Sequence, residues 1–500
     1  MAAKRVVVIG SGFGGLAAAV RLQARGFEVH LCESLPDPGG RARTFHIGPY
    51  AFDGGPTVVT APFLFEELFA LAGKRMEDEV RLLPVDPFYK LFGPSGEELS
   101  YNGDPGFVLP QIERIHAPDG AGYLAFLEAA RPLLQKGFIE LGAEPFTRVS
   151  DMARVAPDLV RLRAYESVYT FVSHHIQHPF LRQCFTFHPL FIGGNPLKAS
   201  SIYAMIHLIE QRWGVWYPQG GMRALVHALV SLFRDLGGAF HLSTPVEQIL
   251  VEDGRVEGVI AGGHRIPADA VISNADAATT YLRLLPPSAT PKKTRWRLER
   301  ARYSMSLVVW YYGLATDRVP DALVHHNIVF GPRYAELIRD IFERKVIADD
   351  FSLYLHVPTR TDPSAAPPGK TAMYVLAPVP NLSARIDWDG EIERLQARVL
   401  QFIEERFWPG FRQFIEVQHR IDPFYFADDL NTYLGTGFSL EPRLTQSAWF
   451  RPHNRSGSIR GLYLVGAGTH PGAGIPGVLL SAKIAEKLVV RDLGEVTSHA

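Results

Sequence analysis

Cysteine is nearly absent from this sequence, which has only Cys32 and Cys184 among its 500 residues. Two cysteines cannot form a disulfide framework, nor a zinc site by themselves, and a reducing, cytosolic compartment fits their scarcity. No His/Cys group has the spacing of a zinc site, so no metal is expected. A Gly-x-Ser-x-Gly elbow is also absent, and nothing indicates a serine hydrolase.

Neither sign of charge dominates. The 51 Lys and Arg residues balance 52 Asp and Glu residues, so nothing points to nucleic acid as a partner. No run of about 18 uncharged apolar residues exists, which argues against a transmembrane helix but leaves open a protein that lies on a membrane. The apolar run after Lys4 and Arg5 continues into a glycine-rich helix start. We therefore reject an export signal and expect a cytoplasmic protein.

What the sequence does contain is a nucleotide-binding motif at its N-terminus. The apolar run Val6–Ile9 predicts a buried parallel strand, and Gly10, Gly12 and Gly15 follow it. The first glycine permits a tight turn, the second lets the backbone approach a pyrophosphate, and the third lets a helix pack closely on the strand. That helix is predicted over 16–25, and its N-terminus directs N–H groups and partial positive charge at the phosphates.

A second strand and an acid complete the unit. Val29, Leu31 and Cys32 predict the strand, and Glu33 at its end is placed to hydrogen-bond a ribose hydroxyl. A glycine motif alone is weak evidence, because glycine-rich turns are common. Here strand, glycines, helix, strand and acid lie in register, which favours a bound dinucleotide over a purely structural turn.

Two further motifs distinguish FAD from NAD. The stretches 38–43 and 52–57 supply a second glycine turn and Arg41, where nicotinamide dehydrogenases usually continue into another βαβ repeat. An arginine here can form a charge-assisted pair with the diphosphate. The pattern resembles the FAD-binding amine oxidase and carotenoid desaturase superfamily, whose signature is the glycine fingerprint, the ribose acid and then Gly-Gly-Arg.

The resemblance implies FAD as the cofactor and a set of residues that hold it. They are Gly10, Gly12, Phe13, Gly14, Gly15, Glu33, Gly40, Arg41, Ala42, Gly55, Pro56, Thr57, Val246, Gly468, Thr469, Ile475, Pro476, Gly477 and Val478. In this superfamily the C-terminal strand, glycine loop and helix bind the ribityl chain and place a helix N-terminus beside the flavin pyrimidine. The loop 466–477 repeats the glycine spacing, but too few residues follow for a second strand and acid, so no NAD(P)H site is expected.

The predicted fold is α/β: a Rossmann-like FAD-binding domain of the glutathione reductase and amine oxidase type, with an inserted α+β substrate domain and a helical region. The discontinuous FAD-binding domain is expected over 1–75, 218–290 and 455–493. The substrate domain is expected over 76–120 and 291–454, and the helical region, predicted to associate with a membrane, over 121–217.

Strands of the substrate domain are expected at Ser306–Leu314, Phe351–Val357 and Met373–Ala377. Their alternation is typical of an antiparallel sheet with one face covering something. Nearer the N-terminus, 82–91 and 98–101 look like short strands on either side of a glycine turn.

Aromatic residues accumulate in the helical region. They are Phe171, Phe180, Phe185, Phe187, Phe191 and Tyr203. Taken alone, such a cluster is more often a helical core, and the alternative is a wall for a long apolar ligand. Aromatics and leucines without convergent charges suit a hydrocarbon. Net charge near zero favours membrane contact by apolar insertion over electrostatic adsorption.

Several stretches resemble bacterial-type phytoene desaturases in particular. They are Ile192–Pro196, Trp213–Pro218, Phe330–Tyr334, Thr445–Asn454 and Gly466–Gly477. The resemblance implies FAD-dependent desaturation of 15-cis-phytoene by removal of hydrogen pairs, to lycopene or, stopping earlier, to neurosporene. The partners it implies are the carotene, a membrane surface on the cytoplasmic side, and a quinone or oxygen that takes the electrons.

Candidate catalytic residues are few, because removing hydride from an allylic carbon needs a nearby flavin, an apolar channel and at most one base. We nominate Asp151, with Arg154 three residues on; the alternative is an exposed helix-start acid with a paired arginine. His470 is a rival because it lies in the flavin loop, where its alternative role is to hold that loop by hydrogen bonds.

Three other functions stay open at the level of sequence. An amine oxidase shares both FAD motifs, but it would want aromatic caging and a lysine near the flavin. A desaturase of C30 or hydroxylated carotenoids is the serious competitor, since channel length sets substrate choice. A non-enzymatic lipid escort on the same fold tends to lose the flavin signature, which is intact here.

Overall fold

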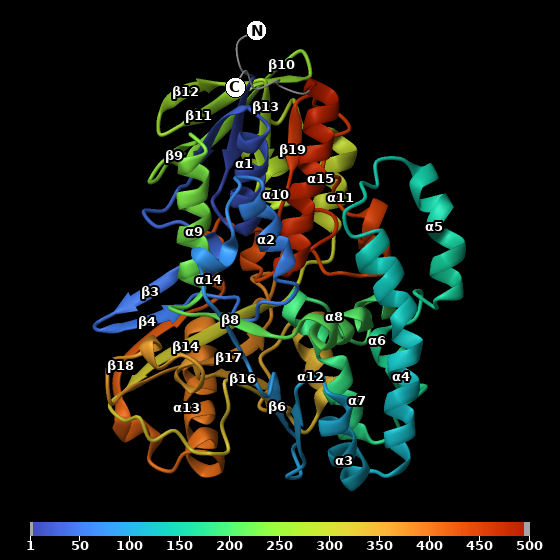
Figure 1. The fold of residues 1–500 in the computed structure, drawn as a ribbon, viewed down its shortest axis with the longest axis vertical. Coiled ribbons are helices and arrows are strands. Elements are labelled where there is room, and N and C mark those ends of the chain that lie inside the picture. The colour runs from blue at the N-terminus through green and yellow to red at the C-terminus, as the bar shows by residue number, and fades with distance from the viewer. Residues whose placement is uncertain (1–3, 495–500) are drawn as a thin grey trace.

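The first βαβ unit forms the middle of a five-stranded parallel sheet in the computed structural model, which describes residues 4–494 (Figure 1). In spatial order the strands are β19 (Leu462–Leu464), β13 (Ala270–Ser273), β1 (Arg5–Ile9), β2 (Glu28–Cys32) and β9 (Ala239–His241). They come from stretches as far apart as residues 5 and 464, and all four pairings are parallel. Their carboxyl ends therefore meet at one edge.

Two layers cover this sheet. The helices packed together on one face are α1 (Phe13–Ala24), α2 (Phe63–Ala70), α9 (Met222–Asp235) and α15 (Ile475–Leu493). On the other face lies an antiparallel sheet of β10 (Val246–Glu252), β11 (Arg255–Ala261) and β12 (His264–Pro267). Helix α1 begins at Phe13, before the expected Leu16, because the glycines after Gly12 already belong to its first turn.

A seven-stranded sheet forms the opposite half of the molecule (Figure 1). In order it contains β18 (Ile415–Ile421), β14 (Ser306–Leu314), β17 (Thr371–Val379), β16 (Leu353–His356), β15 (His326–Val329), β6 (Tyr89–Phe92) and β7 (Glu98–Tyr101). Within this sheet, the strands that follow residue 291 pair antiparallel with one another throughout, as expected, and the one parallel pair joins β15 to the earlier strand β6. Strand β6 reaches this position from far earlier in the chain, so no hairpin sets its direction.

The two faces of this sheet have different neighbours. Helix α13 (Trp388–Arg406) packs on one face, where Trp310 and Tyr312 of β14 point. Val309 and Tyr311, the alternate residues of β14, point to the other face and line a cavity. This alternation follows from the two-residue period of a strand, and the prediction that one face covers something is confirmed.

The expected strand over 82–91 is two strands. β5 (Leu82–Pro84) pairs with β8 (Trp216–Pro218), and β6 begins only at Tyr89. The break falls at Pro87, which lacks the N–H that a continuous ladder needs. The remaining short elements are β3 (Thr44–Ile47), β4 (Tyr50–Asp53), α10 (Ala277–Thr279), α11 (Lys292–Arg300), α12 (Tyr334–Arg339) and α14 (Pro423–Asp428).

The stretch between β7 and β8 is helical, as predicted, and stands beside both sheets (Figure 1). Its helices are α3 (Pro105–Ile115), α4 (Pro118–Leu134), α5 (Val149–Arg161), α6 (Val168–Ser173), α7 (Pro179–Thr186) and α8 (Met205–Trp213). Both interpretations of its aromatic residues hold in part: Phe171, Phe180 and Phe185 belong to the core, whereas Phe191 and Tyr203 line the cavity. Between residues 4 and 494, we find no helix with the length and apolarity needed to span a bilayer.

Candidate active site

The glycine loop lies at the carboxyl edge of the parallel sheet and leaves no room for larger residues. A Cβ atom on Gly15 would lie 1.9 Å from the carbonyl oxygen of Gly10, and one on Gly14 would lie 2.6 Å from Asn274 Oδ1. Gly10 itself has a φ of +87°, which disfavours a side chain. Gly15 therefore fills the predicted role of the third glycine, close packing of helix on strand, and it does not line the cavity.

Glu33 is held rigidly at the end of β2. Its Oε2 accepts hydrogen bonds from the backbone N–H of Ser11, at 2.8 Å, and from the Ser11 hydroxyl, at 2.6 Å. Its Oε1 accepts from the backbone N–H of Leu35 at 3.0 Å. The carboxylate lines the cavity beside the glycine loop, where an acid can receive the hydroxyls of a ribose.

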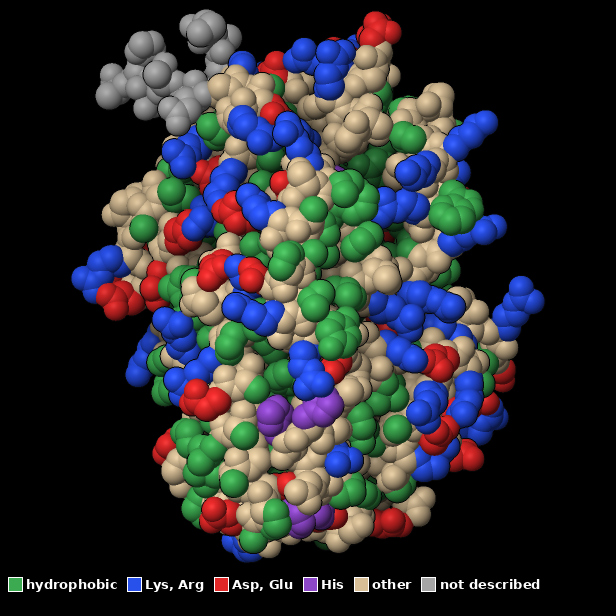
Figure 2. Space-filling view, turned by 90° about the vertical axis from the view of Figure 1, so that its right-hand side faces the viewer, with side chains coloured by type: hydrophobic (Ala, Val, Ile, Leu, Met, Phe, Trp, Pro, Cys, Tyr) green, Lys and Arg blue, Asp and Glu red, His purple; other side chains and the backbone are tan. Residues whose placement is uncertain are grey.

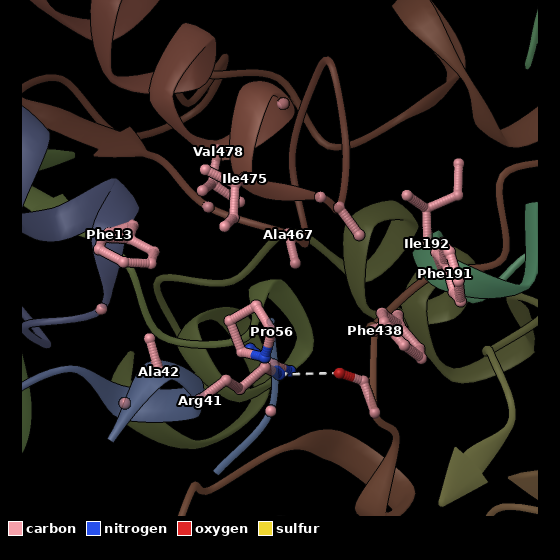
Figure 3. Close-up of a pocket in the computed structure, with 18 of the residues that line it drawn as sticks. Phe13, Arg41, Ala42, Pro56, Phe191, Ile192, Phe438, Ala467, Ile475 and Val478 are labelled. Carbon is pink, nitrogen blue, oxygen red and sulfur yellow. Dashed lines mark hydrogen bonds between the residues drawn. The ribbon is translucent and has the colours of Figure 1, made fainter. Parts of the chain in front are cut away.

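Arg41 is half-buried across from that loop, and one of its nitrogens is unpartnered in the part of the chain that the structure describes. Its Nε donates to the carbonyl oxygen of Gly437 at 2.8 Å, as the dashed line in Figure 3 shows. A terminal guanidinium nitrogen is buried and has no hydrogen-bond partner among the described residues. Burial lowers the pKa of Arg41, an effect that the Asp276 carboxylate opposes. A buried donor without a partner is costly, so this nitrogen fits an anionic ligand.

The C-terminal loop brings a helix N-terminus to the same place. Ile475 and Val478, at the start of α15, lie across the cavity from Arg41 and Pro56 (Figure 3). Gly468 and Thr469 do not line the cavity, and they instead hold the loop: Thr469 donates to the carbonyl oxygen of Pro452 at 2.6 Å.

The other predicted cofactor residues meet around one cavity of about 660 Å³. From the predicted set its lining includes Gly10, Gly12, Phe13, Gly14, Glu33, Gly40, Arg41, Ala42, Gly55, Pro56, Thr57, Val246, Ile475, Pro476, Gly477 and Val478. The sequence interpretation missed Asn274 and Asp276 as cavity residues, although they directly follow a predicted strand of the same sheet. That position at the carboxyl edge was the available signal.

The cavity continues from this end into an apolar part. Its walls there carry Leu190, Phe191, Ile192, Met205, Ile206, Ile209, Phe330, Leu337, Ile338 and Ile341. Phe191, Ile192 and Phe438 lie across from Phe13 and Ala42 of the cofactor end (Figure 3). One continuous cavity thus joins a nucleotide-binding loop to a surface suited to a hydrocarbon.

Comparison with known proteins identifies the family. A family model described as flavin containing amine oxidoreductase matches residues 13–486. The phytoene desaturase (lycopene-forming) of Pseudescherichia vulneris is 51% identical, over 98% of this chain and 100% of its own. The enzyme of the same name from Pantoea ananas is 48% identical over the same shares of both chains.

The chain belongs to the flavin-containing amine oxidoreductase family, in its phytoene desaturase branch.

Solved structures agree on the fold of this flavin-containing amine oxidoreductase. A putrescine oxidase variant has a TM-score of 0.66 at 14% identity, covering 99% of each chain. An oxidoreductase from Methanosarcina mazei has a TM-score of 0.62 at 19% identity, covering 96% of this chain and 98% of its own. These confirm the predicted FAD-binding fold, and the family confirms FAD as the cofactor. The glycine cradle, Glu33 and the unpartnered nitrogen of Arg41 fit that group.

The structure places the nominated pair Asp151 and Arg154 outside the lining of the cavity. Asp151 stands in the first turn of α5 and accepts hydrogen bonds from the backbone N–H groups of Thr147, at 3.0 Å, and Arg148, at 2.9 Å. The bond from Arg148 is the main reason that its pKa is lowered. Arg154 is exposed. This is the geometry of the alternative, a helix-start acid.

His470 is buried next to the cofactor loop and also does not line the cavity. Its ring packs against Phe146, with 5.0 Å between ring centroids. Burial first, and then the positive charge of Arg451, lower the pKa of His470 to about 4. It is therefore neutral near pH 7. Neither ring nitrogen has a hydrogen-bond partner among the described residues, so its contact with the loop's surroundings is the packing on Phe146.

Glu210 is a site residue that sequence interpretation missed. It is 1% exposed on α8 and lines the apolar part of the cavity. Its Oε1 accepts from the Tyr89 hydroxyl at 2.7 Å, and its Oε2 lies 3.1 Å from Nε2 of His188. A carboxylate fixed in an apolar wall can stabilise positive charge on a nearby ligand. Nothing in the local sequence of a mostly apolar helix indicates this role.

Proposed function

We propose that this chain is an FAD-dependent phytoene desaturase that converts 15-cis-phytoene to lycopene in carotenoid biosynthesis. The observation that carries the proposal is the single cavity that joins the cofactor loop to apolar walls, in a chain 46–51% identical to three lycopene-forming relatives. Neurosporene-forming relatives from Rhodobacter capsulatus and Cereibacter sphaeroides are 43% and 40% identical. Neurosporene is therefore the second candidate product.

The residues at the cofactor end would bind FAD and orient it. When bound, FAD supplies an acceptor for a hydride leaving an allylic carbon. Arg41 would hold the diphosphate by its free nitrogen, and Glu33 the ribose. The N-terminus of α15, starting at Ile475, directs its partial positive charge at the same end of the cavity and so favours negative charge there.

The residues at the other end would select an apolar substrate and shield it from water. Aliphatic and aromatic walls suit a polyene and exclude water, and they supply few hydrogen-bonding groups for a polar substrate. This argues against an amine oxidase activity. A C30 desaturase from Methylomonas is 32% identical, well below the lycopene-forming relatives, so C40 phytoene is the favoured substrate class.

The first experiment is to incubate the protein with FAD and phytoene in liposomes and to record the product spectrum. Lycopene is the expected main product. In an anaerobic sample, phytoene liposomes should bleach the flavin band (roughly 450 nm, an expected flavin property), and NADH or NADPH alone should leave it nearly unchanged. Liposomes without phytoene are the control. Bleaching by a nicotinamide and none by phytoene would overturn the assignment.

We further propose that the helical region, 121–217, contacts a membrane on the cytoplasmic side. Large hydrophobic side chains on and beside its helices are exposed; they are Phe107, Leu124, Ile139, Val149, Val160 and Tyr165. Figure 2 shows the side of the molecule on which these helices lie, where hydrophobic side chains are interspersed with Lys and Arg. Phytoene is a water-insoluble hydrocarbon, so an apolar landing surface serves its collection.

Co-sedimentation with neutral liposomes tests this contact. Binding should persist at high salt, because apolar insertion is insensitive to screening, whereas release by salt alone would show an electrostatic contact instead. A membrane also supplies the proposed electron acceptor, a quinone, with oxygen as the alternative. Quinone-loaded liposomes should restore the bleached flavin band without oxygen.

A further inference from the structure

Hydrogen-bonding side chains lead from the cavity into the seven-stranded sheet. Thr57 and Tyr354 line the cavity, and their hydroxyl oxygens are 2.8 Å apart. The Tyr354 hydroxyl lies 2.6 Å from Nδ1 of His326, on the adjacent strand β15. Both tyrosine and histidine are buried, at 8% and 0% exposure. A polar group at the cavity wall is thus connected directly to an imidazole behind it.

The connection continues through two more histidines. One ring nitrogen each of His325, His326 and His356 lies within 4.8 Å of the others. Nε2 of His356 is 3.0 Å from Nε2 of His325, and Nδ1 of His325 is 2.7 Å from the Thr361 hydroxyl. Thr361 is partly exposed. The relay, as the term is used below, consists of five residues: Tyr354, His326, His356, His325 and Thr361.

One link of the relay is not a hydrogen bond in this structure. Nε2 of His326 is buried without a hydrogen-bond partner among the described residues. A buried ring nitrogen without a hydrogen bond costs free energy, which suggests that its position serves a function. The gap to the neighbouring histidines is within the reach of a small movement or one bridging water.

Burial leaves the three histidines neutral. Burial lowers the pKa of His325 to about 3 and lowers those of His326 and His356 well below the usual range. The rings of Tyr217 and Tyr374 face His356, and the Asp53 carboxylate accepts a hydrogen bond from Tyr217. A neutral imidazole has one donor and one acceptor nitrogen, so it can take a proton on one side and release one on the other.

We propose that Tyr354 and His326 accept the proton that desaturation releases, and that His325, His356 and Thr361 pass it to solvent. This inference rests on the proposed function, in which each step removes a hydride and a proton. The hydride leaves with its electron pair to the cofactor. In the same step the neighbouring C–H bond breaks, its electron pair forms the new C=C bond, and its proton goes to the Tyr354 oxygen, so losing this acceptor also slows flavin reduction.

The remaining transfers carry one proton outward and leave His326 and His325 as their other neutral tautomers, so each ring must exchange its proton between its two nitrogens before the next turnover. As Tyr354 receives the proton, its own hydroxyl proton moves to Nδ1 of His326. His326 then releases the proton on its Nε2 toward His325 and His356. The Nδ1 of His325 hands a proton to the Thr361 hydroxyl, which passes it to solvent. No charge stays buried, because each imidazole is a weak base that gives the proton up readily.

Tyr354→Phe tests the inner end, since it removes only the oxygen that receives the proton. Thr361→Val tests the outer end, at a residue that does not line the cavity. Tyr312→Phe is the matched control, because Tyr312 lies in the same sheet but faces the core under α13. Each full-length protein is loaded with FAD and mixed anaerobically with phytoene liposomes. Flavin bleaching and proton release to a pH-indicator dye are followed together, and FAD affinity and metal content are measured separately.

We expect Tyr354→Phe to bleach about 100-fold more slowly than the wild type, in the range of general acid–base effects. Thr361→Val should delay proton release, and both variants should keep the wild-type FAD affinity within about twofold; Tyr312→Phe should match the wild type throughout. Wild-type rates in Tyr354→Phe, or unchanged proton release in Thr361→Val, would overturn the relay. So would one equivalent of a transition metal bound to the purified protein. If the wild type itself is not bleached by phytoene, the proposed function has failed instead.

Discussion

The two ends of the cavity are built by different means. At the cofactor end, short glycine turns bring backbone groups close together, and a few charged side chains such as Glu33 and Arg41 are fixed by hydrogen bonds. At the apolar end, side chains such as Phe191, Ile206 and Ile338 come from separate helices and interact only by packing.

This difference determines how each end responds to change. The cofactor end depends on individual atoms at short distances, so one added methyl group or one lost charge is felt strongly. The apolar end depends on volume, and hydrophobic surfaces tolerate changes of similar size more evenly. Substitutions in the two ends should therefore separate FAD affinity from substrate affinity, with the larger effects at the cofactor end.

The largest effect is expected for Gly15→Ala. The added Cβ would lie 1.9 Å from the Gly10 carbonyl oxygen, so strand β1 and helix α1 must separate and the phosphate-binding turn must distort. Overpacking of this kind costs about 3 kcal/mol or more, which corresponds to a loss of at least about 100-fold in FAD affinity. Titration with FAD, followed by flavin fluorescence, measures it.

Gly457→Ala is the control for this substitution, since nothing lies within 4 Å of the Cβ it would add. It should bind FAD like the wild type. Equal affinities for the two variants would mean that close packing at Gly15 does not shape the site.

The cofactor end could be predicted because its information is local. The residues from Gly10 to Glu33 form one βαβ unit, in which each position has a separate steric or hydrogen-bonding reason. The role of the C-terminal loop was implied by the resemblance to the flavoprotein superfamily, whose strand, glycine loop and helix it shares. Its internal supports, such as the bond from Thr469 to Pro452, depend on contacts with other segments.

The rest depends on contacts that no local pattern encodes. Strand β15 lies beside β6 although more than two hundred residues separate them, and this pairing brings His326 behind the cavity wall. In the sequence, Glu210 is only one polar residue of a mostly apolar helix. Its place in the cavity wall depends on contacts with Tyr89 and His188, which come from other segments. Asp151 was nominated with Arg154, and a helix-start acid was the alternative; only the three-dimensional arrangement places it in the first turn of α5 and outside the lining of the cavity.

The next largest effect at the cofactor end is expected for Arg41→Ala. Removal of a charge-assisted hydrogen bond to the diphosphate should cost about 1.5–3 kcal/mol, or roughly one to two decades in the FAD dissociation constant. Exposed Arg318 provides the control, since Arg318→Ala removes the same charge away from the cavity. An FAD titration unchanged by Arg41→Ala would remove this arginine from the site.

The smallest effect is expected at the apolar end, for Ile338→Val. Ile338 is 3% exposed on α12 and lines the cavity, so the substitution deletes one methylene from the proposed substrate wall. A buried methylene contributes about 0.8 kcal/mol, which predicts a roughly fourfold lower kcat/KM for phytoene with unchanged FAD affinity. Ile392→Val is the matched control: it deletes the same group from the core beneath α13, so it should lower stability alone. A loss of FAD affinity in Ile338→Val, with kcat/KM for phytoene otherwise intact, would show that the two ends do not act separately.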